Sequence, residues 1–139
     1  MRKAFVLVAV FVGFSMTTYW MARAQSSDAV APQVIEVSAK KYEFTPSEIH
    51  VKKGAKVQLK VHSEDETHGV KLDAFPEGTK DKSKPGLIFD PPNENGKVTK
   101  GVDQVIDFVA QEPGTYAFKC AKVCGLGHDR MKGKVIVDE

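Results

Sequence analysis

The chain has 139 residues, of which 42% are hydrophobic and 27% are charged, and this composition is that of one globular domain. Arg2, Lys3 and Arg23 are the basic residues among the first 24, and the rest of the chain balances 17 basic against 18 acidic residues. This balance excludes a strongly basic surface of the kind that binds nucleic acid, so no nucleic-acid partner is expected. Two cysteines allow one disulfide at most, which excludes a small domain held together by several disulfides.

Residues 1–24 are predicted to be a signal peptide or a membrane anchor. Two positive charges precede the uncharged stretch 4–22, and Ala22-Arg23-Ala24 fits a small-x-small cleavage site. If the segment is retained, residues 4–22 are just long enough to tether the protein to the inner membrane. Both alternatives place the remainder outside the cytoplasm, in the periplasm or an equivalent oxidising space.

Residues 25–33, "QSSDAVAPQ", read as a linker, and residues 34–139 as the folded domain. In this domain apolar and polar residues alternate, for example at positions 57–61, which is typical of strands with one buried face. The stretches "TPSE", "KKGA", "EPGT" and "MKGK" read as turns between them. We therefore predict an all-β fold: seven or eight antiparallel strands in a Greek-key β-sandwich or small barrel.

Residues 75–100 form a long excursion that is rich in Pro, Gly, Lys and Asn. One short strand is predicted in it, at residues 87–89. A connection of this length inside a compact domain is often functional, although the sequence does not indicate which function this one has.

The stretch "CAKVCGLGHDRM" gathers a set of soft metal ligands near the end of the chain: Cys120, Cys124, His128 and Met131. Thiolate, imidazole and thioether together favour copper, whereas methionine is a poor ligand for zinc. A Cys120–Cys124 disulfide is an alternative, but it leaves the histidine and methionine unexplained. A buried helical stripe is another, and the glycines that interrupt the run argue against it in favour of a loop between two strands.

A copper site in this loop needs a further ligand from elsewhere in the chain. His50 and His62 occupy outward positions of alternating strands, where a solvated side chain is expected. His68 follows the polar turn "SEDET" and precedes Gly69, so it is predicted to lie in a loop. A loop at the same end of the sandwich as residues 120–131 would bring His68 to these ligands.

The residues resemble the binuclear copper (CuA) domain of cytochrome c oxidase subunit II and nitrous-oxide reductase. "CAKVCGLGHDRM" matches the Cys-x3-Cys-x3-His-x2-Met loop of that family, and the resemblance extends over residues 33–73 and 102–139. The resemblance implies a cupredoxin fold that holds two copper ions. Cys120 and Cys124 would each bridge both ions, His68 and Met131 would complete one, His128 the other, and Lys122 would contribute its main-chain carbonyl.

The sequence departs from the family's pattern at two positions. Lys122 stands where the family often has glutamate, which alters the local charge but keeps the main-chain carbonyl. Trp20 is the one tryptophan and lies in the N-terminal segment, so the aromatic through which oxidase subunits receive electrons is expected to be missing.

These features predict a non-catalytic electron carrier whose redox partner is a c-type cytochrome or a terminal oxidase subunit. Two alternatives stay open: a periplasmic copper-delivery protein, and a mononuclear type 1 blue-copper carrier in which Cys120 takes no part. The acidic run Glu64-Asp65-Glu66 beside His68 favours a basic electron donor.

Overall fold

The structure is a computed structural model that describes residues 30–90, 95–98, 101–123 and 125–139. The predicted signal or anchor segment, most of the predicted linker and Cys124 lie outside these residues. In the part of the chain that is described, no helix combines the length and the apolar character needed to cross a membrane.

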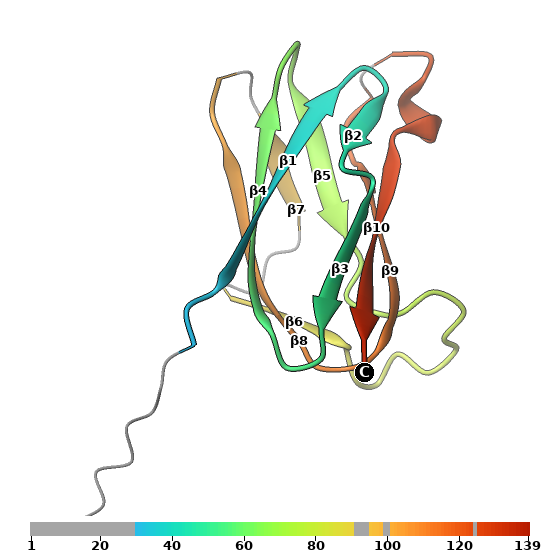
Figure 1. The fold of residues 1–139 in the computed structure, drawn as a ribbon. Coiled ribbons are helices and arrows are strands. Elements are labelled where there is room, and N and C mark those ends of the chain that lie inside the picture. Colours follow the sequence, from blue (N-terminus) through green and yellow to red (C-terminus); the bar gives the residue numbers. More distant parts are fainter. Residues whose placement is uncertain (1–29, 91–94, 99–100, 124) are drawn as a thin grey trace, which may run out of the picture.

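Two five-stranded sheets pack face to face in a β-sandwich, as the alternating pattern predicts (Figure 1). One sheet has the order β2-β1-β4-β8-β6 and the other has the order β3-β10-β9-β5-β7. The strands in the described residues are β1 (Gln33–Lys40), β2 (Glu43–Thr45), β3 (Glu48–Lys52), β4 (Lys56–Ser63), β5 (His68–Leu72), β6 (Leu87–Phe89), β7 (Asn95–Val98), β8 (Gln104–Ala110), β9 (Gly114–Cys120) and β10 (Lys132–Asp138).

The expectation of purely antiparallel pairing is wrong at two places. β1 pairs with β4 in parallel, and β3 pairs with β10 in parallel. The cause lies between Thr45 and Glu48, where the chain leaves one sheet and enters the other, so β2 and β3 do not form a hairpin. The stretch "TPSE" is therefore a crossing between sheets, and "MKGK" is Met131 followed by the first three residues of β10 rather than a turn.

The core lies between the sheets and is built from the inward positions of the alternating strands. Val57, Leu59 and Val61 of β4 are buried while the residues between them are more exposed. Phe44 of β2 meets Phe118 of β9 edge to face across the sandwich, with ring centroids 5.1 Å apart. Burial of each such aliphatic or aromatic side chain stabilises the fold by about 1.5–3 kcal/mol. The packing of these side chains in the core is therefore the main interaction that holds the two sheets together.

The predicted short strand in the excursion is confirmed as β6, Leu87–Phe89, which pairs with β8. β7 was not expected, because Asn95 and Gly96 are poor strand formers. It adds to the edge of the second sheet by pairing with β5, with His68 opposite Val98.

Candidate metal centre

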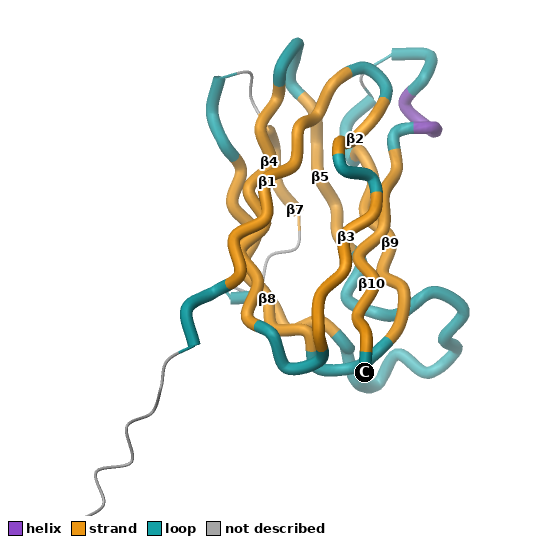
Figure 2. Tube along the Cα trace, in the orientation of Figure 1, coloured by secondary structure: helices purple, strands orange, loops and turns teal. Residues whose placement is uncertain are grey.

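The predicted ligand loop connects β9 to β10 at one end of the sandwich, as Figure 2 shows. Cys120 is the last residue of β9, and Met131 directly precedes β10. The amide of Cys120 donates to the carbonyl of Met131 at 3.0 Å, so the base of the loop is closed by the strand ladder. The helix in the described part of this loop is a single 3-10 turn, His128–Arg130, so the loop prediction is confirmed and the helical-stripe alternative is wrong.

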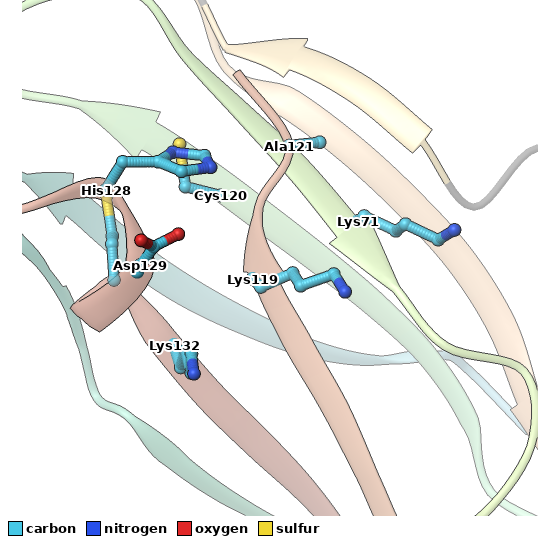
Figure 3. Close-up of a pocket in the computed structure, with 8 residues that line it drawn as sticks. Lys71, Lys119, Cys120, Ala121, His128, Asp129 and Lys132 are labelled. Carbon is cyan, nitrogen blue, oxygen red and sulfur yellow. The ribbon is translucent and has the colours of Figure 1, made fainter. Parts of the chain in front are cut away.

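Backbone hydrogen bonds in the second half of the loop fix the ligand spacing. The amide of His128 donates to Gly125, and that of Met131 donates to the carbonyl of His128, both at 3.1 Å. Met131 is fully buried and His128 is half-buried. The thioether is therefore shielded from solvent, while part of the His128 side chain remains accessible. Cys120 and His128 line the same cavity in Figure 3.

His68 is the first residue of β5 rather than a loop residue, which corrects the expectation from its polar neighbours. It pairs with the edge strand β7 and is fully buried, with no exposed surface. Its Nε2 lies 2.7 Å from Oδ1 of Asp65, and its Nδ1 lies 4.0 Å from Sγ of Cys120. β5 therefore delivers the histidine to the cysteine across more than fifty residues of sequence.

Asp65 selects which nitrogen of His68 is available. A carboxylate accepts hydrogen bonds, so Nε2 donates its proton to Asp65, and Nδ1 is the nitrogen that faces Cys120. Burial raises the pKa of Asp65, but hydrogen bonds from the amides of Lys41 and Glu66 and from His68 outweigh it and lower the pKa to about 2. Asp65 is thus an ionised acceptor at neutral pH.

The main-chain carbonyl of Lys122 points into the site. The thiol of Cys120 donates to this oxygen with a sulfur-to-oxygen distance of 3.0 Å. Gly69 sets the approach of β5 to the same segment: its carbonyl accepts from the amide of Ala121 at 3.0 Å. A Cβ placed on Gly69 would lie only 2.7 Å from the Lys122 nitrogen, so glycine is required for this close contact.

Tyr42 is a residue of the site that the sequence analysis missed. A Cβ placed on Gly127 would lie 2.3 Å from ring atoms of Tyr42, and one placed on Gly125 would lie 2.6 Å from its hydroxyl oxygen. The ring therefore covers the two glycines of the ligand loop from the β1–β2 turn. The aromatic residues of "YEF" indicate that this stretch packs against the core, and Phe44 is indeed buried. The glycines that Tyr42 contacts, however, lie more than eighty residues further along the chain.

The carboxylates of the acidic turn are occupied by neighbours within the protein. Lys41 pairs with Glu66 at 3.0 Å, and Lys40 lies 4.0 Å from Glu64, which also accepts from the hydroxyl of Ser38. Asp65 holds His68. The negative charge of this turn is largely offset, which weakens the argument that it attracts a basic donor.

His50 and His62 are exposed, as expected, and both are paired. His62 lies 2.7 Å from Asp103, and His50 lies between Glu48 and Asp138. Neither is among the residues that line the cavity with Cys120, His128 and Met131. The structure thus brings together His68, Cys120 and the Lys122 carbonyl, with His128 and Met131 in the same loop.

The donor types assembled here fit copper: a thiol, an imidazole nitrogen held by a carboxylate, a buried thioether and a carbonyl oxygen. Within residues 30–90, 95–98, 101–123 and 125–139 no group of three His, Cys, Asp or Glu side chains is close enough to hold a metal. Cys124 is not among these residues, and neither a thioether nor a carbonyl belongs to that set of groups.

A β-sandwich that gathers soft ligands in the loop before its last strand defines the class of small copper-protein domains. The sequence model of the family described as "Cupredoxin-like domain" matches residues 10–137. The chain therefore belongs to the cupredoxin-like family.

Similarity to individual proteins points the same way. The chain is 30% identical over 122 residues to cytochrome c oxidase subunit 2 of Thermus thermophilus, covering 86% of this chain and 78% of that one. It also resembles a chain of a heme-copper terminal oxidase dimer, at 25% identity and a TM-score of 0.56, over 78% of this chain and 66% of that chain. These relatives confirm the resemblance to the copper domain of oxidase subunit II.

Auracyanins, one of which is described as a "blue" copper protein, share the fold. Auracyanin from Roseiflexus castenholzii is 19% identical, with a TM-score of 0.56, over 78% of this chain and 99% of that chain. At this identity the likeness concerns the β-sandwich alone.

Proposed function

We propose that this protein is a non-catalytic electron carrier with a binuclear copper site of the CuA type. The observation that carries the proposal is the position of His68. It is buried, its Nε2 is held by Asp65, and its Nδ1 faces Sγ of Cys120 at 4.0 Å. Such an arrangement, in which the outer nitrogen is bonded to a carboxylate and the inner one faces a thiol, is typical of a metal-ligating histidine.

In this proposal the two copper ions would be held by the thiolates of Cys120 and Cys124 together with His68, His128, Met131 and the main-chain carbonyl of Lys122. Bound in this way, copper would supply one-electron exchange with little change in coordination. The chain's own contribution is to hold the donors in advance. Cys120 and Met131 are joined at the strand ends, Asp65 orients His68, and the Tyr42 ring covers the loop glycines.

A mononuclear blue-copper site is the second candidate, because auracyanin has the same fold. It would use His68, Cys124, His128 and Met131 and leave Cys120 outside the ligand set. The close approach of Cys120 to both His68 and the Lys122 carbonyl favours the binuclear site instead. Copper delivery without electron transfer is the remaining alternative.

We further propose that the protein works outside the cytoplasm, exported or tethered through residues 4–22, and exchanges electrons with a c-type cytochrome or a terminal oxidase subunit. The similarity to cytochrome c oxidase subunit 2 supports this setting. Membership of an oxidase complex remains part of the proposal, because the chain covers 66% of the matching chain in the solved oxidase.

Copper loading of the whole chain tests the proposal. We expect two coppers per chain, a purple colour and an electron spin resonance signal split by two copper nuclei. One tightly bound Cu(II) with a blue absorption band would contradict the binuclear site and support the mononuclear one. A colourless Cu(I) form that exchanges its metal readily would instead support copper delivery.

A further inference from the structure

Three lysines form a row across three neighbouring strands beside the candidate metal centre. Lys71 of β5 is directly opposite Lys119 of β9, and Lys119 is directly opposite Lys132 of β10. Residues opposite each other in antiparallel strands lie on the same face, and neighbouring strands are about 4.8 Å apart. The three ammonium groups therefore share one patch on the outer face of the sheet, the lysine row, drawn in Figure 3.

The row is adjacent to the redox ligands in both sequence and space. Lys119 precedes Cys120 and Lys132 follows Met131, and the backbones of these two ligands are hydrogen-bonded at 3.0 Å. All three lysines line the cavity of about 400 Å³ that Cys120, His128 and Met131 also line. A partner bound at the lysine row would therefore lie beside the cavity that these candidate ligands line.

The positive charge of the row is not neutralised by the described part of the protein. No ion pair of Lys71, Lys119 or Lys132 occurs among the described residues, whereas Lys41 and Lys134 have carboxylate partners. Asp129 is the one acidic side chain among the residues that line the cavity. Like charges directly opposite each other on a sheet are destabilising, so packing and stability do not account for the row.

We propose that the lysine row is the docking surface for an acidic face of the redox partner. This inference rests on the proposed electron-transfer function and specifies the partner's chemistry: clustered carboxylates rather than the lysines of a basic cytochrome. Three adjacent cations raise the rate of encounter with an acidic surface and orient it, and the effect weakens as salt screens the charges. This proposal reverses the expectation of a basic donor that the acidic turn 64–66 suggested. The carboxylates of that turn are already bonded to other side chains, which are Ser38, Lys40, Lys41 and His68.

The test uses one haem protein in two charge states: a basic c-type cytochrome, and the same cytochrome after succinylation of its lysines. Each is titrated into the metal-free whole chain, and backbone amide shifts and the Kd are measured by NMR at low and high ionic strength. We expect the acidic form to bind, to shift amides of β5, β9 and β10, and to lose affinity with salt. The triple variant Lys71→Gln, Lys119→Gln, Lys132→Gln should bind about tenfold more weakly.

The matched control is Lys52→Gln, Lys53→Gln, Lys56→Gln, which removes the same charge at the β3–β4 turn, at the opposite end of the sandwich from the ligand loop (Figure 1). Its Kd should change by less than about twofold. Tighter binding of the basic form, no binding of either form, or an equal loss in the control variant would each overturn the docking surface. Because the chain is metal-free, these results are independent of copper loading, which tests the proposed function separately.

Discussion

Gly69 is the position where one methyl group would disturb the candidate metal centre most directly. Its added Cβ would lie 2.7 Å from the Lys122 nitrogen and 3.1 Å from the Ala121 carbonyl carbon, and both are backbone atoms that cannot rotate away. We expect Gly69→Ala to push the Lys122 carbonyl out of place, to cost about 1–3 kcal/mol of stability and to weaken copper binding. Equilibrium unfolding and copper titration measure the two effects.

Leu72→Ala is the control for Gly69→Ala, because it removes core volume from the same strand at a position opposite Phe118 and adds nothing against the loop. If Leu72→Ala loses as much copper for the same loss of stability, the contact between Gly69 and the loop has no special part in metal binding.

At Lys122 the role of the side-chain charge can be tested separately from the role of the main-chain carbonyl. Its carbonyl oxygen lies 3.0 Å from Sγ of Cys120, whereas its side chain is exposed. Lys122→Glu should keep the carbonyl and the full copper content but lower the reduction potential, since a nearby anion favours the oxidised, more positive state. Voltammetry at low and high salt measures this, and the difference should shrink as salt screens the charge. An unchanged potential at low salt would argue that the Lys122 charge does not reach the centre.

The parallel pair of β3 and β10 carries a pH-dependent contact. Glu48 raises the pKa of His50, and Asp138 on β10 adds to the effect. A histidine whose pKa is raised in the folded state stabilises that state below its unfolded pKa of about 6.5, and this contribution is lost as the pH rises through the folded value. The contacts are exposed, so we expect a small effect that salt reduces.

His50→Gln should therefore lower the urea midpoint of unfolding at about pH 5.5 and leave it nearly unchanged at about pH 9. A loss of stability that is equal at both pH values would show that His50 acts through packing or propensity rather than through its charge.

At the scale of the whole molecule, the alternating pattern predicted the β-sandwich and the buried faces, because period-two burial is a local property. It did not reveal the parallel pairs, because alternation looks the same whichever direction the partner runs. His68 was identified as a ligand candidate by resemblance but placed in a loop, since the polar turn before it hides the start of β5. Tyr42 was missed because its contact with the ligand loop is made only by the folded chain.

The lysine row is a proposed functional surface that the sequence pattern also did not reveal. Lys71, Lys119 and Lys132 are far apart or isolated in sequence, and only the register of β5, β9 and β10 puts them opposite one another. Net charge near neutrality gives no reason to expect a nucleic-acid partner, but it does not show how charge is distributed over one face of the molecule.

The binuclear centre is tested most directly by electron spin resonance and metal analysis of the whole chain beside its Cys120→Ser variant. If both thiolates bridge, the wild-type chain binds two coppers with a spectrum split by two nuclei. The variant then keeps one copper, held by Cys124, His128, Met131 and His68, with a spectrum split by one nucleus and a changed colour. One copper per chain in both proteins, with identical spectra, would contradict the binuclear centre.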